Sequence, residues 1–237
     1  MIVMNPVSIA DAGHQNEPGG CEFASAPGIV QHTPCSRKLS CHATTCRDGP
    51  GRGMTPVIIV NVGHSPAKDA MTLRDRDFSP TRIPQYPNSG GGPAFLDFLE
   101  HELIPFIDRT YRTNTSDRGI PGHSMGGLFA LYALEQRPAL FQRIVAASPA
   151  LSPDNVVSRE ASRALRALPV PVRLDLPVGS DDELGFTKTT TALASVLDNL
   201  NPKGLDYRFT LYPGQNHNSV RLVSFPAGLY WVYGAAK

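Results

Sequence analysis

The chain has 237 residues, of which 41% are hydrophobic and 18% are charged, and its formal net charge is +1. This length and composition are typical of one sizeable globular domain with a closed apolar core. The near-zero net charge gives no electrostatic preference for nucleic acid or an anionic membrane, and no apolar run is long enough to cross a bilayer. We therefore expect neither nucleic acid nor a membrane among its partners.

Residues 1–53 differ in composition from the rest of the chain. They are rich in Gly, Pro, Ser, Cys and His and show no hydrophobic period of 2 or 3.6 residues. Such a stretch buries too little apolar surface to offset the entropy lost on ordering. We therefore predict a poorly structured segment over residues 1–53 and one folded domain over residues 54–237. The segment lacks the basic and apolar regions of a signal peptide, which favours a cytoplasmic location.

All the cysteines fall in this N-terminal segment. Their spacing matches no zinc motif, although His32 and His42 lie nearby. We interpret them as unpaired thiols, with a metal or disulfide cluster as the alternative. The cysteines are Cys21, Cys35, Cys41 and Cys46.

Strand-like and helix-like patterns alternate from residue 56 onward. The β-branched run over residues 57–62 predicts a strand buried on both faces. Residues 65–93 are dense in turn residues and too long for a connector, which suggests a binding loop. A helix is expected over residues 94–111, with a kink at Pro105. Its apolar residues recur at helical spacing on one face, at Phe95, Leu99, Leu103 and Ile107.

The second half of the chain continues this alternation. One expected strand ends near Gly122, and three more cover residues 144–147, 170–180 and 205–214. The expected helices cover residues 125–137 and 190–200, and a last helix starts near residue 225, where Pro226 suits the first turn. This alternation predicts an α/β fold with a mostly parallel sheet and helices on both faces. Binding sites in such folds lie at the carboxyl ends of the strands.

Ser124 lies in the pattern G-x-S-x-G, formed by residues 122–126, between an expected strand and an expected helix. In that context the pattern is typical of a nucleophile elbow, a tight turn that exposes the serine oxygen above the sheet. Side chains in place of Gly122 and Gly126 would clash in such a turn. The turn also leaves the Met125 N–H at a helix N-terminus, where it can donate to an oxyanion. The alternative is a structural Gly-Ser turn.

A serine nucleophile needs a base and an orienting acid, and in this type of fold the chain order is serine, acid, histidine. Three acidic residues follow the strand expected over residues 170–180, namely Asp181, Asp182 and Glu183, and His217 follows the strand expected over residues 205–214. The alternatives are a solvated acidic run and a surface histidine. Three other histidines are interpreted as having no catalytic role: His64, His101 and His123.

Several segments together resemble the Putative esterase (esterase D-like) family of the α/β-hydrolase superfamily. This family includes enterochelin and other siderophore esterases, feruloyl esterases, S-formylglutathione hydrolase and mycolyltransferases. The resemblance runs from residue 55 to the end and rests on VIIVNVG, RDRDFSPT, GGGPAFLDFLEHELIPFIDRTYRT, GHSMGG, FQRIVAASPAL, LPVGSDDE and YPGQNHNSV. It implies an α/β-hydrolase fold with Ser124 as nucleophile and His217 as general base. It favours Asp182 as the acid, ahead of Glu183 and Asp181.

The resemblance also implies strands that residues 1–53 do not resemble. Family members carry about three further strands before the one expected at residue 57, and the loop after the last of them supplies a second N–H to the oxyanion hole. We therefore expect the N-terminal strands of the α/β-hydrolase fold to be missing or divergent in this chain.

The leading hypothesis is a serine carboxylic-ester hydrolase that acts on a small-molecule ester through an acyl-enzyme. Its catalytic triad is Ser124, His217 and Asp182, its oxyanion donor is the Met125 N–H, and it requires no metal or organic cofactor. The alternatives are a catalytically inactive protein with an incomplete sheet and an acyltransferase that uses the same triad. Three charged residues of the long loop line the acyl or alcohol pocket or form a solvated face: Arg74, Arg76 and Asp77.

Overall fold

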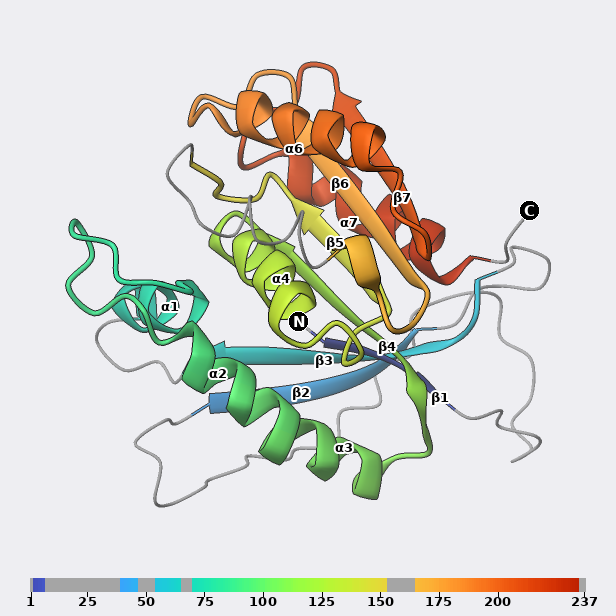
Figure 1. The fold of residues 1–237 in the computed structure, drawn as a ribbon. Helices are drawn as coiled ribbons and strands as arrows, with labels where there is room; N and C mark the ends of the chain where they lie inside the picture. Colours follow the sequence, from blue (N-terminus) through green and yellow to red (C-terminus); the bar gives the residue numbers. More distant parts are fainter. Residues whose placement is uncertain (1, 7–38, 47–53, 65–69, 153–164, 235–237) are drawn as a thin grey trace.

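A seven-stranded sheet forms the centre of the molecule, with the strand order β2-β3-β1-β4-β5-β6-β7 (Figure 1). The computed structural model describes residues 2–6, 39–46, 54–64, 70–152 and 165–234. The strands are β1 (Ile2–Pro6), β2 (Leu39–Cys46), β3 (Val57–His64), β4 (Thr113–His123), β5 (Arg143–Ala147), β6 (Val172–Gly179) and β7 (Leu205–Tyr212). The helices are α1 (Ala70–Phe78), α2 (Gly92–Phe98), the π-helix η1 (Leu99–Leu103), α3 (Ile104–Thr110), α4 (Met125–Gln136), the 3₁₀ helix η2 (Leu165–Ala167), α6 (Phe186–Leu200) and α7 (Val220–Tyr233).

The sheet is mostly parallel, as the alternation of strands and helices predicted. Strands β4, β5, β6 and β7 pair in parallel with one another. Strand β3 runs in the same direction as β4, because both are antiparallel to β1, which lies between them. The carboxyl ends of β3 to β7 therefore share one edge of the sheet, which we call the carboxyl edge, and the helix α4 starts there directly after β4.

Helices cover both faces of the sheet, which confirms the predicted layers (Figure 1). Buried residues of α2, η1, α3, α4 and α6 pack against one face in the larger core cluster. Residues of α7 pack against the other face with Val57 of β3 and Val145 of β5. The apolar residues expected on one face of the first long helix are all at most 3% exposed: Phe95, Leu99, Leu103 and Ile107.

Strands β1 and β2 lie within the segment that the sequence predicted to be poorly structured, so that prediction was wrong for residues 2–6 and 39–46. Strand β2 pairs with β3 along its whole length, from Leu39 opposite His64 to Cys46 opposite Val57. The backbone hydrogen bonds that pair β2 with β3 do not require a hydrophobic period in the sequence of β2. Composition and periodicity therefore did not reveal this strand. Cys41, Cys46 and His42 lie on β2, whereas Cys21, Cys35 and His32 lie outside the described residues.

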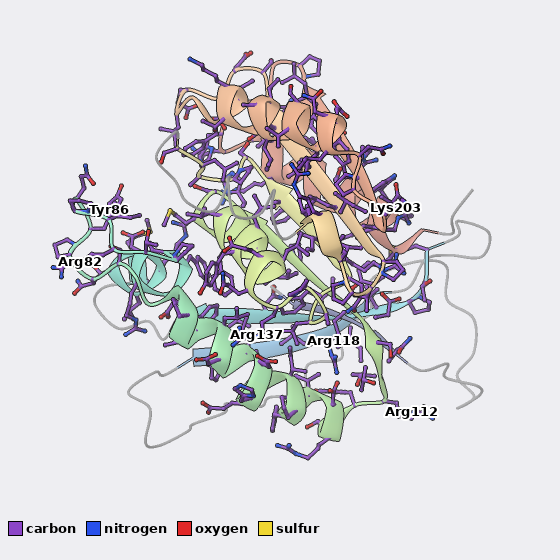
Figure 2. The ribbon with its side chains drawn as sticks, viewed as in Figure 1. Arg82, Tyr86, Arg112, Arg118, Arg137 and Lys203 are labelled. Carbon is purple, nitrogen blue, oxygen red and sulfur yellow. The ribbon has the colours of Figure 1, made fainter. Side chains whose placement is uncertain are left out.

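The long loop predicted over residues 65–93 contains the helix α1, which the sequence analysis missed. Turn residues on both sides dominated the pattern, but the nine residues of α1 include none of Gly, Pro, Asn or Ser and several good helix formers. Beyond α1, the loop carries Arg82 and Tyr86 outward, away from the sheet (Figure 2). Within the predicted binding loop, α1 is therefore the part that we consider for binding.

Two prolines lie within helices. Pro105 is in the first turn of α3, directly after the π-helical turn η1, in which the Ile104 N–H donates to the Leu99 carbonyl. This longer turn accommodates a residue without an N–H. Pro226 lies inside α7 and not in its first turn, because the helix already begins at Val220. The carbonyl that loses its helical partner there belongs to Leu222, which is exposed.

Two arginine–aspartate pairs join β6 to β7, and they differ in burial. Asp175 is fully buried and receives two hydrogen bonds from its cross-strand partner Arg208, at 2.8 and 2.9 Å. Arg173 pairs in the same way with Asp206 at 3.0 Å, but that aspartate is 62% exposed. Both guanidinium groups lie over the ring of Trp231 on α7.

We therefore expect the same amide substitution to have unequal effects at the two positions. Asp175→Asn should lower the free energy of unfolding by about 2 kcal/mol, because it leaves the partly buried Arg208 cation without its counter-charge. Asp206→Asn should lower it by less than about 1 kcal/mol, because solvent screens the exposed pair. Urea unfolding at pH 7 measures both values. Equal effects would contradict the importance of burial here.

Candidate active site

Ser124 has the backbone geometry of a nucleophile elbow. It follows β4 directly, precedes α4, and has φ 60° and ψ −121°, which a residue with a side chain rarely adopts. A Cβ on Gly122 would lie 2.0 Å from the carbonyl oxygen of Gly126, so only glycine fits at position 122. At Gly126 itself an added Cβ would meet nothing closer than Phe78 at 4.0 Å, so the clash expected there does not occur.

Backbone hydrogen bonds from the neighbouring strand hold this turn in place. The Ser124 N–H donates to the Ala147 carbonyl at the end of β5 over 3.0 Å. The Ser124 carbonyl accepts from the N–H groups of Leu128, over 3.0 Å, and of Ala150, over 3.1 Å. Both polar groups of the strained residue are therefore satisfied, and the turn is fixed to β5 and to the first turn of α4.

Asp182 and His217 form a buried pair at the same edge of the sheet. The Asp182 side chain is fully buried and the His217 side chain is 8% exposed. Asp182 Oδ2 lies 2.9 Å from His217 Nδ1. Because a carboxylate only accepts, Nδ1 carries the proton and Nε2 is left unprotonated in the neutral imidazole. The other oxygen, Asp182 Oδ1, accepts from the Leu184 N–H over 3.1 Å. Asp182 is thus fixed on both sides.

The three acidic residues that the sequence left open have different positions. Asp182 alone contacts the imidazole ring of His217 through a hydrogen bond that the structure describes. Glu183 accepts from the backbone N–H of His217 over 3.3 Å. Asp181 is exposed and accepts from the Ser180 hydroxyl. This arrangement agrees with the preference for Asp182 over its neighbours.

His123, which the sequence analysis assigned no catalytic role, contacts His217 directly. The His123 Nε2–H donates to the His217 carbonyl over 2.7 Å, and the two ring centroids are 4.5 Å apart. The ring of Phe186 lies 5.2 Å from the His217 ring in an edge-on orientation. Burial lowers the pKa of His123 to about 4; the hydrogen bond to the His217 carbonyl raises this pKa, and the positive charges of Arg221 and Arg74 lower it. His123 is therefore a neutral donor at pH 7.

This contact joins His217 to the residue directly before Ser124. Among the described residues, no hydrogen bond joins Ser124 Oγ to the His217 ring. In structures without substrate this bond is often long or poorly aligned. The Met125 N–H belongs to the first turn of α4, where N–H groups lack a partner within the helix.

Among the described residues, the second oxyanion donor that the family resemblance implied has no counterpart beside β4. The strand next to β4 is β1, which is antiparallel, so its carboxyl end at Pro6 pairs with Thr113 at the opposite edge of the sheet. The carboxyl end of β1 therefore lies far from Ser124. Within the described residues, Met125 is the donor that the elbow itself provides.

A cavity of about 290 Å³ lies beside the elbow, and we call it the β3–β4 cavity. Its walls include Val62 of β3 and residues 120–123 of β4, together with Gly126 of the elbow. Of the three charged residues proposed for a pocket, Arg74 lines this cavity. Arg76 and Asp77 instead pair with each other, over 2.9 Å.

A separate group of possible metal ligands, Asp97, Glu100 and His101, lies on the exposed side of α2 and η1. The guanidinium of Arg137 donates to both carboxylates, and Figure 2 shows this arginine between α4 and the α2–η1 helix. An arginine thus already neutralises these carboxylates.

In the part of the chain that the structure describes, no helix combines the length and apolar character needed to cross a membrane.

The chain belongs to the family described as Putative esterase, whose model matches residues 40–217. The match begins in β2 and ends at His217. In sequence, "Ferri-bacillibactin esterase BesA" of Bacillus subtilis (strain 168) is 37% identical over 109 residues, which are 42% of this chain and 38% of that protein. The chain therefore matches less than half the length of this curated relative.

Two solved structures share the fold. The BES protein from Bacillus cereus aligns with a TM-score of 0.74 over 96% of this chain and 100% of that chain, at 22% identity. An IroE-like serine hydrolase from Shewanella oneidensis aligns with a TM-score of 0.65 over 77% of this chain and 62% of that one, at 28% identity. These alignments confirm the predicted α/β-hydrolase fold.

The neutral state of His123 makes a contribution to stability that depends on pH. Its pKa of about 4 in the folded protein is below the usual 6.5, so between these values the unfolded chain binds a proton that the folded protein does not. Stability therefore falls as the pH falls from 6.5 to 4. We expect His123→Gln, which keeps an N–H donor, to show a smaller drop in melting temperature between pH 7 and pH 4.5.

The control for this measurement is His101→Gln, since the His101 side chain is 66% exposed. Its melting temperature should drop as much as that of the original protein. If His123→Gln drops equally, the His123 ring does not resist protonation in the folded state.

Proposed function

We propose that the protein is a serine carboxylic-ester hydrolase that works through an acyl-enzyme. The observation that supports this most directly is the buried pair of Asp182 and His217, which lies against the residue before the strained Ser124. A histidine oriented by a buried carboxylate is the base that a serine hydroxyl needs at neutral pH. Membership of the Putative esterase family supports the same reaction.

In the proposed reaction, the unprotonated Nε2 of His217 takes the proton of the Ser124 hydroxyl while Oγ attacks the ester carbonyl carbon. The carbonyl oxygen becomes an oxyanion, which accepts from the Met125 N–H at the start of α4. The C–O bond to the alcohol then breaks, and His217 gives its proton to the leaving alkoxide. Water then attacks the acyl carbon while His217 takes its proton; the bond from this carbon to Ser124 Oγ breaks, His217 returns the proton to Oγ, and the acid is released.

Asp182 has two tasks in this scheme. Its hydrogen bond to Nδ1 selects the tautomer in which Nε2 can accept a proton, and its negative charge stabilises the imidazolium that forms. Neutral His123 supports the second task, because a protonated ring at 4.5 Å would repel that imidazolium.

We further propose that the substrate is a siderophore-type ester, in the sense of a metal-chelating small molecule held together by ester bonds. The support is the similarity to the Bacillus subtilis relative named as a ferri-bacillibactin esterase. The similarity extends over 109 residues, and the loops around a site commonly select its substrate.

Replacement of the nucleophile tests the class of reaction. Ser124→Ala should lower the hydrolysis of 4-nitrophenyl acetate and butyrate by at least about 10³-fold, because attack on the carbonyl loses its nucleophile. A fluorophosphonate probe should label the original protein at Ser124 and leave the variant unlabelled. Ser116→Ala, at an exposed serine on β4, is the matched control and should keep full activity.

Full activity in Ser124→Ala would overturn the proposal. A folded original protein that neither hydrolyses these esters nor reacts with the probe would favour the catalytically inactive alternative, in which the oxyanion hole is incomplete.

Amide substitutions of the acidic residues test which of them orients His217. Asp182→Asn keeps the shape of the side chain but removes its charge and favours the wrong tautomer, so kcat/KM should fall by about 10³-fold or more. Glu183→Gln retains an oxygen that can accept from the His217 N–H, and the loss should stay below about tenfold. Asp181→Asn alters an exposed residue and should stay within about twofold. A larger loss at position 181 or 183 than at position 182 would reassign the acid.

A further inference from the structure

The β3–β4 cavity exists because β1 separates β3 from β4 along only part of their length. Strand β1 pairs with β3 as far as Val60 and with β4 as far as Gly119. Val62 and residues 120–123 continue toward the carboxyl edge beyond that pairing, and they face the cavity. Among the described residues, no strand fills the interval between β3 and β4 there, next to the elbow.

Side chains from both faces of the sheet meet in this opening. Phe95 and Phe129 belong to the core of the α4 face, whereas Phe225 of α7 packs on the opposite face. Phe78 of α1 completes the aromatic wall. The volume of about 290 Å³ fits a group the size of one ring, and the aromatic walls favour an apolar or aromatic stem.

Two arginines line the same cavity. The ion pair that Arg74 makes within the described residues joins its Nη1 to Asp75 Oδ1 over 3.9 Å, which is too long for a hydrogen bond. Arg221, near the start of α7, is exposed and makes no ion pair with the other described residues. Both charges act on His123 and lower its pKa, so both lie near one point beside the elbow.

No aspartate or glutamate is among the residues described as lining this cavity. The buried acid of the site, Asp182, is already hydrogen-bonded on both oxygens. Two guanidinium groups without a hydrogen-bonded carboxylate, beside an aromatic wall, form a recognition site for a carboxylate or another anion on an apolar stem.

We infer that the β3–β4 cavity is a subsite that binds a negatively charged, ring-sized arm of the substrate through Arg74 and Arg221. The inference rests on the proposed function, because Gly122, His123 and Gly126 line the cavity and would hold the arm next to the ester carbonyl at Ser124. The arm can belong to the acyl or to the alcohol side of the ester.

Binding to the Ser124→Ala protein tests the subsite without catalysis. Benzoate and 3-phenylpropionate should bind with at least about tenfold higher affinity than benzamide, a neutral probe of the same size, in calorimetric titrations at low ionic strength. The preference should disappear in Arg221→Gln, and Arg221→Glu should reverse it. Because Arg221 is exposed, these changes leave the fold intact, which circular dichroism verifies.

The matched control is Arg112→Gln, an exposed arginine that precedes β4 at the opposite edge of the sheet (Figure 2). It should keep the full preference for benzoate. Equal affinity for benzoate and benzamide in the Ser124→Ala protein, or an unchanged preference in both Arg221 variants, would overturn the subsite.

A pair of esters of equal shape links the subsite to catalysis. The protein with Ser124 should hydrolyse 4-nitrophenyl hydrogen terephthalate, which carries a carboxylate, with a higher kcat/KM than 4-nitrophenyl 4-methylbenzoate. The ratio of the two values should fall by at least about tenfold in Arg74→Gln and in Arg221→Gln. If neither ester is hydrolysed, the proposed function fails while the carboxylate titration still decides the subsite. If both are hydrolysed and the ratio does not change, the subsite fails and the esterase proposal stands.

Discussion

The site depends on one strained residue. Ser124 has a positive φ that costs about 1–3 kcal/mol for a residue with a side chain, and such a conformation persists only when its surroundings fix it. Here Ala147 of β5, Ala150 in the segment after β5, and Leu128 of α4 fix it through backbone hydrogen bonds. The helix is in turn held by its buried residues in the main core. The free energy gained by packing α4 therefore maintains the geometry that exposes the Ser124 hydroxyl and directs the Met125 N–H.

Burial also sets the charge state around the base. The Asp182 carboxylate and the His217 ring exclude water from their contact, and His123 beside them stays neutral because its pKa is about 4. If His123 were protonated at pH 7, a cation would lie against the ring that becomes an imidazolium in the proposed reaction. A buried neutral histidine supplies a hydrogen bond to the His217 backbone without that repulsion. Its place directly before Ser124 connects the position of the base to the position of the elbow.

The sequence predicted those parts of the fold whose signals are local. The alternating β-branched and amphipathic segments located β3 to β7 and the long helices, and the Gly-x-Ser-x-Gly pattern located the elbow. Strands β1 and β2 were missed because their evidence is backbone pairing with β3 and β4, which no local period records. His123 was passed over for a similar reason. Its contact with His217 joins residues 94 positions apart, and only the folded sheet brings them together.

The direction of β1 links the two features that distinguish this site. An antiparallel strand beside β4 carries its carboxyl end to the far edge, so the described residues of β1 do not bring that end near Ser124. The same strand pairs with only part of β3 and β4, which leaves the cavity open at the carboxyl edge. In the proposed reaction, the oxyanion donor that the described residues offer is the α4 N-terminus, while Arg74 and Arg221 give the adjoining space a positive potential. Within the described residues, a negative charge near the elbow is therefore stabilised mainly by the N-terminus of α4 and by the side chains of Arg74 and Arg221, and less by backbone N–H donors of a loop.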